Sequence, residues 1–175
     1  RVLAYTNATS ARLLLNGKPV GDTKPYDAET GIMAWDIPFE TGKLEVVGLD
    51  ASGAETCRAP IQSAGPAATM RLSADETTID RHQGLAMVVL QIVDKNGVPV
   101  MNATHEVTCH LEGPARLLGL EASNNRDMSD YTDAVHHVYH GHILAYIQAT
   151  GTAGDIRVRF TADELPEASV QLRAQ

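Results

Sequence analysis

Apolar residues alternate with polar residues in short runs along the whole chain, and no segment repeats them at the 3.6-residue period of a helix. In the N-terminal part these runs recur about every ten residues and cover residues 3–5, 12–15, 32–39, 43–49 and 55–61. The pair Asn16-Gly17 follows the second run, and both residues tolerate the positive φ angles of a two-residue hairpin turn. The pattern predicts a β-sandwich for residues 1–64.

Small and polar residues, including Gly65 and Pro66, interrupt the pattern at residues 62–68 and indicate a domain boundary. Beyond it, apolar alternation returns in the runs 69–74, 85–93, 106–111, 115–120, 143–148, 156–160 and 169–172. Runs of this number and spacing within about 110 residues are typical of an immunoglobulin-like sandwich. We therefore predict an all-β protein of two tandem immunoglobulin-like β-sandwich domains, residues 1–64 and 65–175.

The same pattern predicts which side chains are buried. The run 85–93 is almost continuously apolar, as expected for a central strand with both faces covered. Trp35 is the single Trp of the chain and is expected to be a core anchor, with a sugar-stacking platform as the alternative. Cys57 and Cys109 fall in different predicted domains and are too few for a disulfide framework, so both are expected to be free, buried thiols.

Composition narrows the classes of partner. Hydrophobic residues make up 43% of the chain and the mean hydropathy is -0.15, an ordinary balance for a globular protein. There is no run of about 18 apolar residues, so no membrane span is predicted. The net charge is -8 without a Lys/Arg cluster, which argues against nucleic-acid binding because phosphate contacts supply most of that affinity. The chain begins at Arg1 directly in strand-like sequence, so we expect a piece of a longer protein.

A long polar connection between two predicted strands is the best candidate for specific binding. Its polar side chains suit hydrogen bonding to sugar hydroxyls or docking of another domain, and they are Asn124, Asn125, Arg126, Asp127, Asp130 and Tyr131. The spacing of Asp127, Asp130 and Asp133 also allows a calcium site, although the glycine and terminal glutamate of an EF-hand are missing. The favoured interpretation is an ordered loop whose polar side chains bond its own backbone.

Histidines crowd the strand that follows this connection. On an extended strand His136, His140 and His142 would share one face, where zinc binding is possible in principle. No cysteine lies nearby to complete a familiar zinc motif. A solvated or hydrogen-bonded histidine face is therefore the favoured interpretation, and neither a metal nor another cofactor is predicted.

The order of several short motifs resembles the C-terminal region of bacterial glycoside hydrolase family 2 enzymes, mostly β-galactosidases and some β-glucuronidases. In the first half, LNGK (15–18), MAWDIPFETGKLEV (33–46) and DASG (50–53) resemble the accessory sandwich that follows the catalytic barrel of these enzymes. In the second half, VDKNG (93–97), GPARLLG (113–119), DYTD (130–133) and YHGHILAYI (139–147) resemble their C-terminal immunoglobulin-like domain.

The resemblance implies a non-catalytic accessory region that packs on the upstream catalytic domain of a β-galactosidase-like enzyme, located in the periplasm or secreted. The catalytic glutamates of that family lie in an upstream barrel, which takes about 250 residues, more than this chain can supply beside two sandwiches. No residue of this chain is therefore expected to be catalytic, and the chain alone is expected not to be an enzyme. Oligomerisation of the full-length enzyme is compatible with this role.

Two alternatives remain open at the level of sequence. The chain could be a carbohydrate-binding module that holds its enzyme near a β-galactoside-containing glycan. It could also be an adhesion module from a bacterial surface protein built of immunoglobulin-like repeats.

Overall fold

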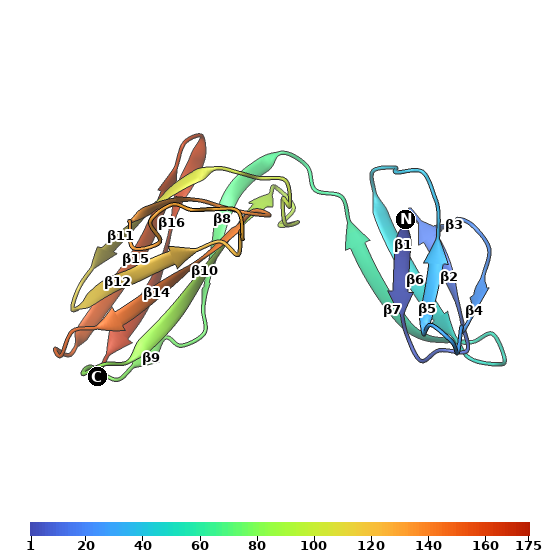
Figure 1. The fold of residues 1–175 in the computed structure, drawn as a ribbon, viewed down its shortest axis with the longest axis horizontal. Coiled ribbons are helices and arrows are strands. Elements are labelled where there is room, and N and C mark those ends of the chain that lie inside the picture. Colours follow the sequence, from blue (N-terminus) through green and yellow to red (C-terminus); the bar gives the residue numbers. More distant parts are fainter. The chain divides into compact units, whose positions relative to one another are not determined.

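The computed structural model describes all residues from Arg1 to Gln175, and every regular element in it is a β-strand (Figure 1). The chain divides into two compact units, Arg1–Ser63 and Ala64–Gln175. Each unit contains two β-sheets. The predicted all-β class with tandem immunoglobulin-like sandwiches is confirmed. The chain contains no helix of the length and apolarity needed to cross a membrane.

The first unit contains short antiparallel strands in two sheets. One sheet pairs only β1 with β5, and the other has the order β3-β2-β6-β7 with β4 joined to β2. The strands are β1 (Val2–Tyr5), β2 (Ser10–Leu15), β3 (Lys18–Pro19), β4 (Lys24–Pro25), β5 (Ile32–Trp35), β6 (Lys43–Leu49) and β7 (Glu55–Gln62). The main core cluster between the sheets is formed by Ala4, Ala11, Leu13, Met33 and Trp35.

Local chemistry explains the ends of these strands. Asn16 and Gly17 turn the chain between β2 and β3 with φ angles of 51° and 78°, which confirms the predicted hairpin turn. Trp35 is 3% exposed, and its Nε1–H donates a hydrogen bond of 2.8 Å to the carbonyl oxygen of Asp22, so its core role is confirmed. The strand predicted to run to Phe39 ends instead at Trp35, because Pro38 has no N–H for ladder pairing, and Phe39 is 84% exposed.

The edge strand β7 corrects the prediction that Cys57 is buried. Every residue of β7 is exposed, including Cys57, which is nevertheless a free thiol. The opposing sheet has only β1 and β5, and the core residues that it contacts lie on β2 and β6. Neither face of β7 is therefore buried within this unit.

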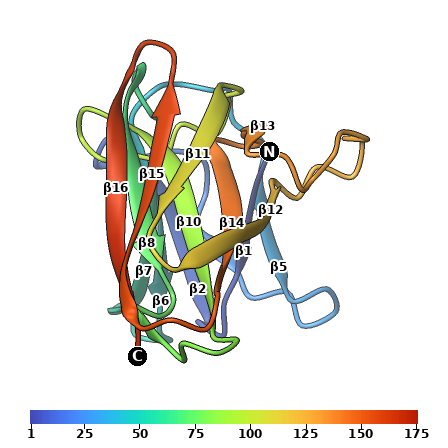
Figure 2. The ribbon, with the colours of Figure 1, turned by 90° about the vertical axis from the view of Figure 1, so that its left-hand side faces the viewer.

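The second unit is a complete sandwich of two larger sheets (Figure 2). A four-stranded sheet has the order β12-β14-β10-β8, and a five-stranded sheet has the order β13-β11-β15-β16-β9. All neighbouring strands pair antiparallel except β16 with β9. The strands are β8 (Ala67–Ala74), β9 (Thr78–Ile79), β10 (Leu85–Asp94), β11 (Glu106–Glu112), β12 (Ala115–Glu121), β13 (Val135–His137), β14 (His142–Ala149), β15 (Gly154–Ala162) and β16 (Leu165–Ala174).

Alternate residues of both sheets build one continuous core in this unit. Phe160 is completely buried at its centre, together with Leu90, Ile147 and Val158. Cys109 is buried as predicted, and the loss of hydration raises the pKa of its thiol to about 12. At neutral pH this thiol is protonated and acts as a small apolar side chain.

Strand β10 is central, as predicted, but its outward face is covered only towards its C-terminal end, where Val93 is 3% exposed. Ala86, Val88, Leu90 and Ile92 point into the core and are 0% exposed. The outward side chains Leu85, Met87 and Val89 are 44%, 37% and 38% exposed. The prediction that both faces of this run are buried was therefore wrong for residues 85–89, because the sandwich places its second sheet on one side of β10 only.

The carboxylate of Asp94 fixes the entry of the chain into the second unit. Its side chain accepts hydrogen bonds from the backbone N–H groups of Gly65, Asn96 and Val98, with distances of 2.8 to 2.9 Å. Asp94 is 2% exposed. These bonds, led by that from Gly65, lower the pKa of Asp94. One side chain thus closes the predicted 94–97 turn and ties residue 65 to the end of β10.

Candidate functional site

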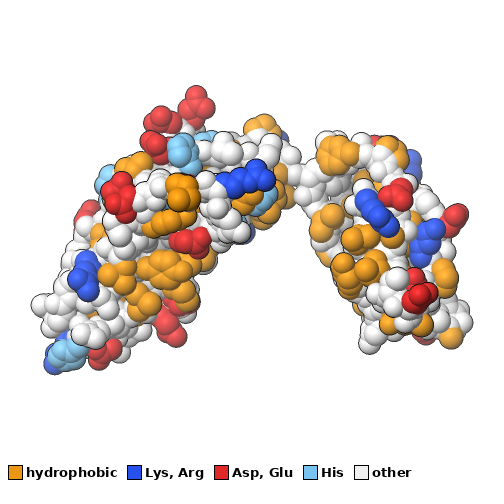
Figure 3. Space-filling model, viewed as in Figure 1, with side chains coloured by type: hydrophobic (Ala, Val, Ile, Leu, Met, Phe, Trp, Pro, Cys, Tyr) orange, Lys and Arg blue, Asp and Glu red, His pale blue; other side chains and the backbone are white.

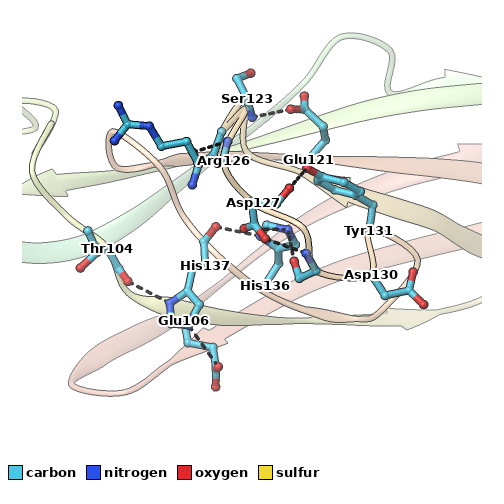
Figure 4. A network of polar contacts seen from close by, with 12 residues as sticks. Thr104, Glu106, Glu121, Ser123, Arg126, Asp127, Asp130, Tyr131, His136 and His137 are labelled. Carbon is cyan, nitrogen blue, oxygen red and sulfur yellow. Dashed lines mark hydrogen bonds and ion pairs between the residues drawn. The ribbon is translucent and has the colours of Figure 1, made fainter.

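The predicted binding residues lie in the connection of residues 122–134, between β12 and β13 (Figure 4). Here the N–H of Asp127 donates to the carbonyl oxygen of Asn124 at 2.9 Å, and the N–H of Arg126 donates to the Asn124 side-chain oxygen at 3.2 Å. The N–H of Ser129 donates to Asp127 Oδ1 at 2.9 Å. The connection is therefore held in shape by consecutive turns closed by its own Asn and Asp side chains.

Asp130 closes the next turn in the same way. Its Oδ1 accepts hydrogen bonds from the N–H and the hydroxyl of Thr132, at 2.8 and 2.7 Å. The bond from the Thr132 hydroxyl is the main cause of a lowered pKa for Asp130, and hydrogen bonding by Ser129 is the main cause of a lowered pKa for Asp127. Both carboxylates are thus charged at neutral pH and already engaged, as expected for an ordered loop.

Tyr131 and His136 form the centre of a small polar cluster (Figure 4). Their rings stack with centroids 5.5 Å apart, and the Tyr131 hydroxyl donates to the carbonyl oxygen of Asp127 at 2.9 Å. The His136 side chain is 1% exposed, and its Nε2 lies 3.2 Å from Ser129 Oγ and 3.6 Å from Asp127 Oδ2. Its Nδ1 lies 2.9 Å from the carbonyl oxygen of His137. The buried His136 side chain therefore holds the loop in place through its polar contacts.

The loop is also fastened to the neighbouring strands through its backbone. The carbonyl oxygen of Tyr131 accepts a hydrogen bond of 2.7 Å from the N–H of Leu120, and that of Ala134 accepts one of 2.8 Å from the N–H of Cys109. A Cβ atom at Gly119 would lie 2.6 Å from the same Tyr131 oxygen. The backbone at Tyr131 reaches β12 only because residue 119 has no side chain.

The predicted histidine face does not exist. His136 belongs to β13, whereas His140 has a φ angle of 50° and forms a turn with Gly141, so that the chain reverses before His142. Residues on opposite sides of a reversal do not share a strand face. Tyr139 and His142 are paired across this turn.

Neither metal set that the sequence allowed is assembled. The structure contains no group of three or more His, Cys, Asp or Glu side chains arranged to hold a metal ion. Asp127, Asp130 and Asp133 therefore do not form such a group. The Asp127 and Asp130 carboxylates instead hold backbone N–H groups of the loop.

Part of the predicted set does face solvent and is available for contacts. Asn125, Arg126 and Tyr131 are exposed, and Tyr131 is 40% exposed despite its stacking on His136. Met128, which the sequence did not single out, is 92% exposed at the same loop. The arrangement offers an amide, a guanidinium and one aromatic edge on an open surface, which suits weak hydrogen bonding.

The first unit contains a groove that the sequence did not predict. Two cavities of about 290 and about 360 Å³ lie between β1 and β7, and both are lined by Val2, Leu44 and Ile61. Their lining is mainly apolar, and Cys57 borders one of them. The groove exists because the sheet of β1 and β5 is too narrow to cover β7, which no local pattern reveals.

Comparison with protein families gives two matches along the chain. Residues 70–171 match the family described as Glycoside hydrolase family 2 C-terminal domain 5. Residues 1–57 match a family described as Domain of unknown function (DUF4982). No curated protein matches the chain.

Solved structures of larger proteins contain the same fold. A glycosyl hydrolase family 2 member from Bacteroides cellulosilyticus has a TM-score of 0.94 and 27% identity over 99% of this chain and 22% of its own. A beta-glycosidase from Bacteroides vulgatus has a TM-score of 0.89 and 25% identity over 98% of this chain and 22% of its own. A family 2 beta-glucuronidase shares the fold at 19% identity, with a TM-score of 0.88 over 98% of this chain and 18% of its own. The chain thus spans about a fifth of the length of these proteins.

Proposed function

The chain belongs to the family of glycoside hydrolase family 2 C-terminal domain 5, and on that premise we propose that it is the non-catalytic C-terminal accessory region of a family 2 glycosidase. Residues 1–64 and 65–175 are its two accessory domains. The observation that carries the proposal is the fit of 99% of this chain to 22% of a glycosyl hydrolase family 2 member at a TM-score of 0.94. Because the fit includes both sandwiches, the two proteins share the order of these domains along the sequence as well as the common sandwich fold.

The roles of the buried carboxylates support a non-catalytic assignment. A retaining glycosidase needs two carboxyl groups about 5 Å apart that are free to act on the substrate. Glu45 and Asp94 are the buried carboxylates of this chain, and they lie in different units. Glu45 forms ion pairs with Lys43 at 2.8 Å and Arg58 at 3.2 Å, and Asp94 is occupied by three backbone N–H groups. Both carboxylates thus have partners that belong to the fold of their own unit.

The partner in this proposal is the upstream catalytic domain of the same polypeptide. The related structures are described as a glycosyl hydrolase, a beta-glycosidase and a beta-glucuronidase, so we assign the parent enzyme to the hydrolysis of β-glycosides. A β-galactoside is the substrate expected from the sequence motifs, and a β-glucuronide is the alternative. A bacterial source and a periplasmic or secreted location belong to the same proposal.

The coding sequence upstream of Arg1 tests the assignment directly. We expect a (β/α)₈ barrel with two glutamates at strand ends. A series of further immunoglobulin-like repeats in that place would contradict the proposal and favour the adhesion module. The 175-residue chain itself should give no hydrolysis of aryl β-galactosides or aryl β-glucuronides above a no-protein control.

A structural role makes a second prediction for the parent enzyme. Removal of these residues should lower its melting temperature while leaving KM for a small aryl glycoside unchanged in the protein that remains folded. A truncated enzyme with unchanged thermal stability would contradict a supporting role.

Glycan binding by the 122–134 loop is the second candidate function, and the exposure of Asn125, Arg126 and Tyr131 favours it. Affinity electrophoresis in gels containing a β-galactoside polymer should then retard the chain. Arg126→Ala should abolish the retardation, whereas Gln171→Ala, an exposed polar position on β16, should not. Equal mobility with and without the polymer would eliminate this candidate.

A further inference from the structure

The two outer faces of the second unit have opposite chemistry. The outward side chains of β11, β15 and β16 are polar, and they include Thr108, His110, Arg157, Arg159, Thr161 and Gln171. The outward side chains of β10 and β14 are largely apolar, and Figure 3 shows hydrophobic side chains gathered on this unit. A two-sheet sandwich normally presents polar residues on both outer faces. The four-stranded sheet therefore departs from the pattern that its partner sheet follows.

The apolar side chains form one connected surface. Strand register pairs Met87 with Tyr146 and Val89 with Leu144, so these side chains touch across β10 and β14. We call this surface the β10/β14 face, and it consists of Leu85, Met87, Val89, Leu118, Leu144 and Tyr146. Four strands about 4.8 Å apart and about seven residues long give the outer face of this sheet, polar edges included, an area of roughly 450 Å², of which the apolar strip along β10 and β14 is about half. Contiguous apolar patches of a few hundred Å² on a protein surface are often functional.

Opposite charges follow each other along the β12 side of the face. Arg116 lies level with Leu85, because both pair with Gln148. Glu121 lies level with Val89, because both pair with Leu144. We call this edge of the face the β12 rim. Along it, in the direction from Leu85 towards Val89, a positive charge is followed by a negative one.

The β8 side of the face carries the reverse order. The N–H of Asp75 donates to the carbonyl oxygen of Met87 at 3.1 Å, and Arg71 pairs with Gln91 further along β10. Along this edge, the β8 rim, the negative charge of Asp75 is followed in the same direction by the positive charge of Arg71. None of the charges on the two rims takes part in an ion pair within the chain.

This alternating pattern is complementary to itself. A two-fold axis parallel to the strands places the β12 rim of one copy over the β8 rim of the other, which brings opposite charges together. An axis in the plane of the sheet but across the strands places each rim over the same rim of the other copy, running in the opposite direction. Opposite charges meet in this arrangement too. Face-to-face two-fold contacts of identical patches are the commonest form of protein self-association.

We propose that a second copy of this chain covers the β10/β14 face, in a two-fold dimer with an apolar centre and paired charges at its rims. Tyr146 and Met87 lie at its centre, and aromatic and methionine side chains are enriched at such positions. The inference rests on this chain alone and holds whatever the parent protein hydrolyses. Because the footprint is small, we expect dissociation in the micromolar range.

Sedimentation equilibrium of the chain, from about 1 to about 500 μM, tests the proposal. The weight-average mass should rise towards twice that of the chain. Met87→Glu places a charge twice at the symmetric centre and should weaken the dimer at least roughly 100-fold. Gln171→Glu, an exposed change on the opposite outer face, should leave the dissociation constant unchanged.

A second pair of variants tests the rims. Arg71→Glu with Arg116→Glu makes both rims acidic, and Asp75→Lys with Glu121→Lys makes both basic. Each variant alone should be monomeric, and their mixture should form a one-to-one heterodimer. If the basic variant does not fold, judged by circular dichroism, the acidic variant still serves, since it should be monomeric where the unchanged chain dimerises.

Three results would overturn the proposal. They are a chain that stays monomeric throughout the concentration series, an acidic variant that dimerises as tightly as the unchanged chain, and equal weakening by Met87→Glu and Gln171→Glu. The first of them would assign the β10/β14 face to the remainder of the parent polypeptide.

Discussion

The second unit closes its two sheets over a core along the full length of its strands, whereas the first unit leaves one strand of its larger sheet uncovered. Ile61 on β7 is 67% exposed in the first unit, while Phe160 and Ile147 on comparable strands of the second unit are completely buried. The difference follows from sheet width, because two strands face five in the first unit and four face five in the second. Small domains also bury a smaller fraction of their surface than larger ones. We therefore expect the second unit to be the more stable of the two.

The largest expected effect breaks the second unit alone. Phe160→Ala leaves a cavity at the centre of its core and should destabilise that unit by about 3–5 kcal/mol. Trp35 is the only Trp of the chain, so its fluorescence reports the first unit, while circular dichroism reports both. Urea titration should show a lower midpoint for the part of the dichroism that belongs to the second unit. An equal shift of the fluorescence midpoint would mean that the units do not unfold separately.

The reciprocal change acts on the first unit. Leu13 is 1% exposed, and Leu13→Ala should destabilise that unit by about 2–4 kcal/mol. A unit with a limited core has little stability to lose, so the fluorescence midpoint should fall close to zero urea. The dichroism change of the second unit is the internal control. A fluorescence midpoint that moves only slightly would show that the first unit is better packed than its exposed β7 suggests.

Acid should act on the second unit through Asp94. Its pKa is lower in the folded chain than in the unfolded one, so its stabilising contribution is complete above about pH 5 and is lost as the pH falls through the lower, folded-state pKa. Asp94→Asn removes the titrating group. The variant should be less stable at pH 7, and its stability should fall less than that of the unchanged chain between about pH 5 and pH 2. Parallel losses in the two proteins over this range would contradict the assignment.

The smallest expected effect concerns β7. Ile61→Ser changes a side chain that is already in contact with water and should alter the stability of the first unit by less than about 0.5 kcal/mol. The fluorescence-detected urea midpoint measures this, with Leu13→Ala as the sensitive reference. A loss above about 1 kcal/mol would mean that β7 is covered in solution, and the contrast between the two units would then be wrong.

Local pattern identified most strands, because strand periodicity and turn chemistry depend on neighbouring residues. The run 43–49 coincides with β6, and Asn16-Gly17 turns the chain where expected. The candidate loop was also found from its polar composition. Its actual organisation was not, since the stacking of Tyr131 on His136 and the turn at His140 bring together or separate residues that a simple alternating strand would arrange otherwise.

The sequence by itself determined the all-β class, the tandem sandwiches and the family, because alternation, turn residues and motif order are all written along the chain. Only the tertiary structure decided which strand faces are covered. The alternation in β7 and the continuous apolar run of β10 both predict a strand. Yet β7 is exposed throughout, whereas β10 is buried along its inward face. The reason is physical: burial depends on the width and position of the opposing sheet, which is assembled from strands far away in the sequence.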